Sequence, residues 1–164
     1  MNYTDNATKL LACNDFGEIF ELVKKAAEQS LGMHRAGLTL VLGDLPNSIG
    51  AYHELGSNSI VMNRNLVKIV WEISGSQNLR NSYVFMILLH EYLHSLGIAD
   101  DAQVRELGER ISKAYLGEGH IAADMAVKPL DKFFPDVGRY TMFRDRGSYE
   151  TVSKFDSSST PYIA

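Results

Sequence analysis

Apolar side chains recur at the spacing of one helical face in three stretches of the chain, residues 16–31, 66–73 and 101–116. The first stretch follows Asp15 and Glu18, which have the spacing of an N-terminal capping box. Residues 82–96 form a further helix-length run without proline or glycine, and Gly97 follows it as a helix C-terminal glycine would. The pattern therefore predicts four main helices, with a short fifth helix over residues 121–127.

Strand-like segments are confined to the region between the first two helices. Residues 37–42 form a short β-rich run, and residues 49–53 and 59–63 flank a turn-forming stretch, which predicts a hairpin. The expected fold is α+β, with a small, mainly antiparallel sheet packed on the 82–96 helix and on the other helices.

Domain organisation follows from the same pattern. Residues 1–139 carry the predicted helices and strands, and we interpret them as a single catalytic domain. Residues 140–164 are rich in Ser, Thr, Tyr and charged side chains with weak periodicity, and we expect a partly ordered C-terminal tail.

Composition narrows the classes of partner and location. Apolar residues make up 45% of the 164 residues, and the formal net charge is −4 with both signs interspersed, so no nucleic-acid partner is expected. Cys13 is the single cysteine, which excludes an intrachain disulfide and a cysteine-based zinc cluster. No signal-peptide pattern and no membrane-length apolar run is visible, so we expect a cytoplasmic protein with no membrane partner.

The most informative pattern lies within the 82–96 helix, where His90 and His94 are four residues apart and Glu91 follows the first histidine. Side chains at i and i+4 share one face of a helix, so both imidazoles can reach one metal ion. Glu91 would lie beside the metal, where it could accept a proton from a water that the metal has made acidic. The motif arises by chance in on the order of one chain per hundred, and a structural helix with hydrogen-bonded histidines is the competing interpretation.

This segment resembles the active-site helix of the zincin metallopeptidases. The resemblance implies that His90 and His94 bind Zn²⁺, that Glu91 is the general base, and that peptides or proteins are the substrates. The continuation also resembles the metzincin signature, in which a glycine, here Gly97, is followed three residues later by a third ligand. That position holds Asp100 instead of the usual histidine, and the resemblance covers about eleven residues.

The identity of a third ligand stays open at this stage, because a catalytic zinc site takes three protein ligands. His120 is the first choice, since imidazole is a strong zinc ligand and flanking glycines would let the chain turn it inward. Asp100 is the alternative, although an acidic residue there is also expected as a helix N-cap. Asp101 comes third, through a loose similarity to the gluzincin pattern.

A strand before the motif helix is a candidate for substrate binding. In zincins an edge strand commonly lines the substrate cleft. By this similarity, residues 49–53 could bind a substrate backbone, and His53 could stabilise the oxyanion.

Two other classes of protein are alternatives to a peptidase. One is an endoribonuclease-like hydrolase, because residues 90–101 faintly resemble the histidine-triad pattern of bacterial endoribonucleases. The other is a non-catalytic zinc-binding module.

Overall fold

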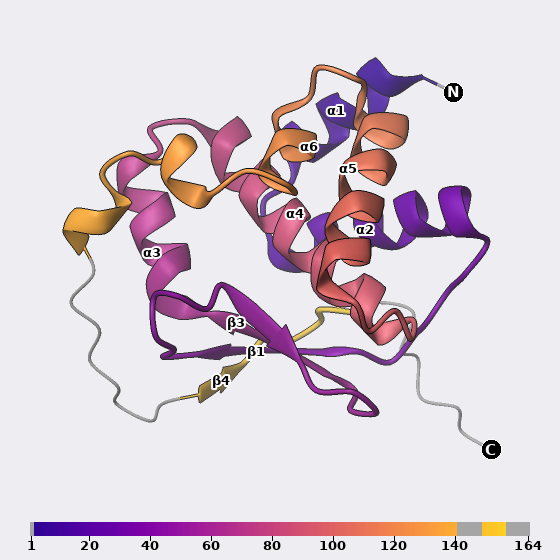
Figure 1. Cartoon of the computed structure of the whole chain (residues 1–164), viewed down its shortest axis with the longest axis horizontal. Helices are drawn as coiled ribbons and strands as arrows, with labels where there is room; N and C mark the ends of the chain where they lie inside the picture. Colours follow the sequence, from indigo (N-terminus) through magenta and orange to yellow (C-terminus); the bar gives the residue numbers. More distant parts are fainter. Residues whose placement is uncertain (1, 141–148, 157–164) are drawn as a thin grey trace.

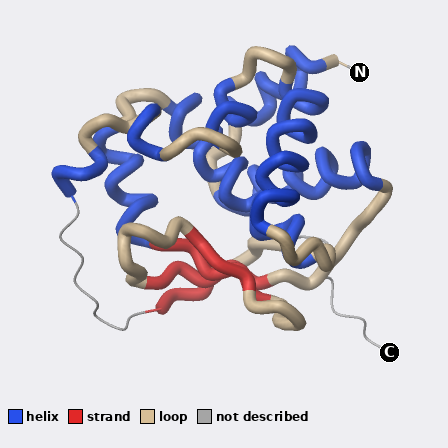
Figure 2. Tube along the Cα trace, viewed as in Figure 1, coloured by secondary structure: helices blue, strands red, loops and turns tan. Residues whose placement is uncertain are grey.

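The computed structural model describes residues 2–140 and 149–156. In this part of the chain, helices gather on one side of a small sheet, and α4 lies at the centre of the helical layer (Figures 1 and 2). The α-helices are α1 (Tyr3–Ala12), α2 (Phe16–Leu31), α3 (Arg64–Ile73), α4 (Gln77–Ser95), α5 (Asp101–Leu116) and α6 (Ile121–Met125). The strands are β1 (Thr39–Gly43), β2 (Ala51–His53), β3 (Ser59–Asn63) and β4 (Tyr149–Thr151), and two short 3₁₀ helices are Leu130–Lys132 and Val137–Tyr140. The α+β class is therefore confirmed.

The sheet is mixed, with strand order β2-β3-β1-β4. The predicted hairpin is confirmed, because β2 and β3 pair antiparallel, with Tyr52 opposite Val61. The central pair, β1 with β3, is parallel, which the expectation of a mainly antiparallel sheet did not include. The reason is that β2 takes the edge position, so β1 meets the returning strand β3 instead of its neighbour in sequence. In the described residues β2 pairs with β3 alone and presents a free edge.

The helix ends follow the signals in the sequence. Asp15 Oδ1 accepts a hydrogen bond from the Glu18 amide at 2.8 Å, and Gly32 ends α2 with φ +66°. The predicted helices correspond to α2, α3, α4, α5 and α6, whereas α1 was not predicted. No helix in the described ranges combines the length and apolar character that crossing a bilayer requires.

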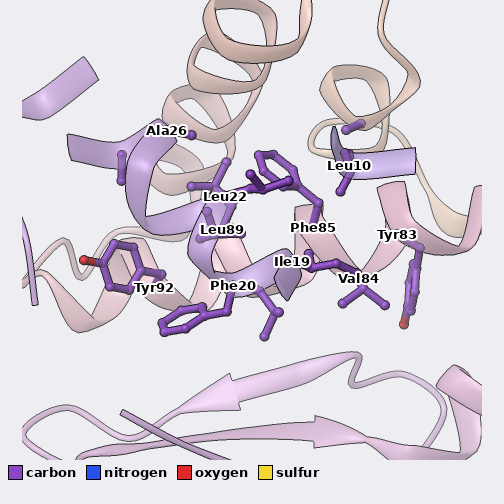
Figure 3. Close-up of a cluster of buried hydrophobic side chains, with 14 of the residues drawn as sticks. Leu10, Ile19, Phe20, Leu22, Ala26, Tyr83, Val84, Phe85, Leu89 and Tyr92 are labelled. Carbon is purple, nitrogen blue, oxygen red and sulfur yellow. The ribbon is translucent and has the colours of Figure 1, made fainter. Parts of the chain in front are cut away.

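The main core lies where α2 packs along α4. Figure 3 shows side chains from both helices meeting in one cluster, with Phe20 and Tyr92 in an edge-to-face contact at 5.5 Å. Burial of this kind stabilises a fold by about 25 cal/mol per Å² of apolar surface. One face of α4 therefore packs in the core, and His90 and His94 lie on another face of the same helix.

Part of the expected tail belongs to the folded domain. Strand β4 pairs antiparallel with β1, and Phe155 stacks on Phe20 with a centroid separation of 4.2 Å. The Asp156 side chain is buried against Lys24. The remaining residues of that segment, 141–148 and 157–164, lie outside the described residues.

Candidate metal centre

The end of α4 fixes the orientation of the second motif histidine. Gly97 adopts φ +99°, a conformation that favours glycine, and the chain turns back so that the Ile98 amide donates to the Leu93 carbonyl at 3.4 Å. The Ile98 carbonyl oxygen then lies 2.7 Å from His94 Nδ1. Because a carbonyl oxygen only accepts hydrogen bonds, His94 Nδ1 carries a proton, and Nε2 of the neutral ring is a bare lone pair.

The two acidic residues after the turn have separate roles. Asp100 is the N-cap of α5, and its Oδ1 accepts a hydrogen bond from the Gln103 amide at 2.7 Å. Asp101, the first residue of α5, points back to α4 instead. Its Oδ1 lies 2.9 Å from His94 Nε2 and 3.3 Å from His90 Nε2, and the two nitrogens are 3.2 Å apart. The sequence feature that allows this is a pair of adjacent acids, since only one of them can occupy the cap.

These three atoms form a triangle of the size that a small cation would fit. Ligand atoms at 2.0–2.1 Å from a tetrahedral zinc ion are about 3.3 Å from one another. His94 Nε2 and the Asp101 carboxylate oxygen are both acceptors, so their contact is favourable when a cation or a proton, such as one on His90 Nε2, lies within the triangle. Within the described ranges, His90, His94 and Asp101 are the group of histidine and acidic side chains placed to hold a metal ion. The hydrogen bond from His94 Nδ1 to the Ile98 carbonyl oxygen is also of the kind that metal-binding imidazoles usually make with their second ring nitrogen.

Glu91 lies beside this triangle and is almost completely buried, with 6% of its surface exposed. Burial raises the pKa of Glu91 to about 7, an effect that His94 opposes and Asp101 reinforces. A carboxyl group with a pKa near neutrality can both accept and return a proton at that pH. Burial and the neighbouring His94 lower the pKa of His90, which favours the neutral, ligand-competent imidazole.

A cavity of about 880 Å³ opens in front of these groups. The α4 side of its wall comprises Tyr83, Met86, Ile87, His90, Glu91 and His94. Strand β2 and residues 47–50 also line the cavity, and so do residues 125–130. The volume is in the range of small-molecule and peptide-binding clefts, and the wall combines apolar side chains with the few polar groups just described.

His120, the first choice for a third ligand, lies elsewhere. Its Nδ1 accepts a hydrogen bond from the Ala122 amide at 3.1 Å, so it caps α6, and burial lowers its pKa. In the described part of the chain, it does not belong to the group formed by His90, His94 and Asp101, and it is absent from the cavity wall. The physical reason is distance, because the uninterrupted helix α5 rises about 24 Å between Asp101 and the turn before His120. The structure brings Asp101 to the imidazole pair, rather than His120 or Asp100.

His53 does line the cavity, from edge strand β2. Its Nδ1 lies 2.9 Å from the Ser59 carbonyl oxygen and therefore donates to it, while its Nε2 has no partner. In the neutral ring Nε2 can only accept, so the predicted oxyanion role would require a second proton on His53. Tyr83 and Asn47 also line the cavity, and nothing in the sequence pattern singled them out.

No family model, curated protein or solved structure matches this chain. Its function must therefore be argued from the geometry of this site.

Proposed function

We propose that this protein is a zinc-dependent metallopeptidase with a zincin-like site, in which His90, His94 and Asp101 hold the metal ion and Glu91 is the general base. The observation that carries the proposal is the triangle of three possible ligand atoms 2.9–3.3 Å apart, with the His94 tautomer set by Ile98. The Asp101 carboxylate and the lone pairs of neutral imidazoles would attract a divalent cation at the centre of this group. Imidazole nitrogens and a carboxylate oxygen are ligand types that zinc accepts.

When bound, the metal ion would supply Lewis acidity, which polarises a carbonyl group and makes water acidic. Glu91 does the proton transfer: its buried carboxylate takes the proton from the attacking water and gives it to the departing amine. The Ile98 carbonyl keeps the His94 ring in one tautomer, and the rigid helix α4 keeps Glu91 one residue away from the first ligand.

The free edge of β2 supports a peptide as the substrate. The Asn63 amide donates to the Gly50 carbonyl at 2.8 Å, which makes this a hydrogen-bonded pair of the β2–β3 ladder. Pairs alternate along an antiparallel ladder, so the backbone N–H and C=O groups of Ala51 and His53 point to the free edge. Both residues line the cavity, where an extended peptide can pair with them and cross in front of Glu91.

The proposal is tested first by metal content per chain, measured by mass spectrometry after zinc is supplied and excess zinc is removed. Wild type should retain about one zinc ion, and His90→Ala and Asp101→Asn should lose it, because the first removes a ligand atom and the second removes the negative charge of a ligand. His120→Ala is the control and should retain the metal. Retention by Asp101→Asn together with loss in His120→Ala would contradict the ligand assignment, and no metal in wild type would favour a structural role for the motif.

Turnover on a peptide library tests the chemistry separately. Glu91→Gln should keep the zinc and lose about 10²–10⁴-fold in kcat, since the amide cannot accept a proton. Hydrolysis at the wild-type rate by that variant would exclude Glu91 as the base. Metal bound by wild type without any peptide cleavage would favour a non-catalytic module.

A further inference from the structure

Positive charge in the cavity wall comes from one part of the fold. Among the described residues, the lysine, arginine and acidic side chains of the wall are Glu91, Asp101, Arg105 and Lys128. The two acids belong to the candidate metal centre, and the wall residues of β2 and of 47–50 include neither lysine nor arginine. The cations therefore lie on α5 and on the segment that follows α6.

Arg105 lies one helical turn after Asp101 on α5. Residues at i and i+4 share a helix face and are about 6 Å apart along the axis, and both of these residues line the cavity. An acid at this spacing is the usual ion-pair partner of an arginine, but the Asp101 carboxylate is directed at the two imidazoles instead. Within the described ranges no ion pair of Arg105 is present, and its side chain is exposed, so its N–H donors can meet a ligand.

The charge of Arg105 also acts on the metal centre. Burial is the largest cause of the lowered pKa of His90, and the positive charge of Arg105 adds to it. The guanidinium group is therefore near the end of the cavity where Glu91 lies, and an anion that it binds would be near the reacting bond.

Lys128 belongs to the segment that packs against the same helix (Figure 1). A Cβ atom on Gly108 would lie 3.6 Å from Ala126 Cβ, so the two backbones approach closely three residues after Arg105 and two residues before Lys128. Lys128 Nζ lies 3.5 Å from Asp124 Oδ1, and these side chains are 54% and 50% exposed. A solvent-exposed pair of this kind contributes little, so the ammonium group can turn to an anion in the cavity.

The chemistry of these groups selects a planar anion. A guanidinium group presents parallel N–H donors that match the two oxygens of a carboxylate, and an ammonium group adds a compact charge. We propose that Arg105, assisted by Lys128, binds a carboxylate of the peptide substrate, supplied by an acidic side chain or by the C-terminus. This inference rests on the proposed function. Because Arg105 is one helical turn from Asp101 and an extended peptide advances about 3.3 Å per residue, the carboxylate should lie within about three residues of the cleaved bond.

Two sets of peptides test the carboxylate site and distinguish the two sources. In the first set, Glu, Gln or Lys occupies one position at a time, within three residues on each side of the cleaved bond. In the second set, the peptide ends one, two or three residues after that bond, as a free acid or as an amide. Metal-loaded wild type should prefer the carboxylate over its neutral counterpart by about fivefold in kcat/KM at one position, a modest factor because both cations are exposed. The preference should fall at high ionic strength, because salt screens exposed charges.

Variants of α5 assign the preference to Arg105. In Arg105→Gln, the preferred carboxylate peptide should lose about fivefold more than its neutral counterpart, and Arg105→Glu should favour Lys over Glu at that position. Arg110→Gln is the matched control, because Arg110 is an exposed arginine of the same helix outside the cavity wall, and it should keep the wild-type preference. A purely structural role of Arg105 would lower the cleavage of all peptides alike.

Preference for Glu would identify an acidic side chain as the source, and preference for the free acid would identify the C-terminus. Equal cleavage of charged and neutral peptides at every position, or equal losses for both in Arg105→Gln, would overturn the site. If metal-loaded wild type cleaves no peptide, the proposed function fails, and the site is then judged by calorimetric binding of the same peptides. Binding of a carboxylate peptide about fivefold tighter than its neutral counterpart, lost in Arg105→Gln but kept in Arg110→Gln, would support the site. Equal binding, or none, would overturn it.

Discussion

Two clusters of ionisable side chains in this molecule differ in whether one of their own members is a lysine cation. In the first, Lys24 Nζ lies 2.6 Å from Asp156 Oδ1 and 2.6 Å from a Glu21 oxygen. The other Asp156 oxygen accepts hydrogen bonds from the amides of Gly37 and Leu38 at 3.0 and 3.2 Å. Burial alone lowers the pKa of Lys24, but the hydrogen bonds to Asp156 and Glu21 raise it overall, so the ammonium stays charged.

In the second cluster, two imidazole nitrogens of His90 and His94 and a carboxylate oxygen of Asp101 point at one another, and Glu91 is buried beside them. Lys24 supplies a positive charge at the centre of the first cluster, whereas the four side chains of the second cluster are histidines and acids. A cluster that contains its own cation stabilises the fold, here by joining the segment after β4 to α2, whereas a cluster of possible ligand atoms can bind a cation from solution. Substitutions should therefore have opposite consequences in the two places.

The largest effect on stability is expected from Lys24→Met. The substitution keeps the length of the side chain but leaves the Asp156 carboxylate buried without its cation, which should lower the free energy of unfolding by about 3–5 kcal/mol. Chemical denaturation measures this, and the metal content per folded chain should not change. Lys25→Met, at the adjacent exposed position of α2, is the control and should stay within about 0.5 kcal/mol of wild type. A Lys24→Met protein as stable as that control would show that the pair does not hold the segment.

Glu91→Gln should raise the free energy of unfolding of the metal-free protein, whereas Lys24→Met should lower it. The pKa of Glu91 is raised from 4.5 to about 7, so the folded state binds a proton more tightly than the unfolded chain does. Stability from this group is fully present below pH 4.5, falls as the pH rises, and is lost above about pH 7. At pH 8 the substitution should therefore stabilise the metal-free protein by up to about 3 kcal/mol, with the difference disappearing near pH 4.5.

Denaturation curves of metal-free wild type and Glu91→Gln between pH 4.5 and 8 give this difference directly. Asp101→Asn is a useful companion, because the Asp101 side chain is mostly exposed and a change there should have much less effect on stability. An unchanged or lower stability of Glu91→Gln at pH 8 would mean that the buried carboxylate has partners in the folded state that compensate its charge.

Local sequence signals predicted most of the helices but not the arrangement of the sheet. Helix α2 could be predicted because its cap, its apolar face and its terminal glycine all lie within about 18 residues. The parallel pairing of β1 with β3 depends instead on which strand takes the edge, and this is decided by tertiary packing. Helix α1 escaped prediction because its face contributes a single buried residue, Leu10, and the helix is held from outside by Asn81, which donates to the Leu10 carbonyl at 2.8 Å.

The same division applies to the site. His90, Glu91 and His94 could be proposed from spacing alone, since a single helix places them on neighbouring positions. The contact of Asp101 with the imidazoles depends on the turn between α4 and α5, and the sequence left three candidates in place of one. Residues outside the motif, such as Arg105, stand out only after the structure shows which side chains line the cavity.

Gly97→Ala should change the free energy of unfolding less than Lys24→Met or Glu91→Gln does, but it should also weaken zinc binding at the second cluster. At φ +99° an alanine is strained by about 1–2 kcal/mol, and the turn can relieve this strain by moving the Ile98 carbonyl away from His94. Loss of that contact removes the outer-shell partner of a metal ligand, so zinc affinity should fall about 10–100-fold, as measured by competition with a chelator. Gly119→Ala is the control, because that glycine has open space around it and no positive φ, and it should leave both properties near wild type. If Gly97→Ala lost stability but kept its zinc affinity, the Ile98 carbonyl would only end the helix, and the His94 tautomer would be set by the metal itself.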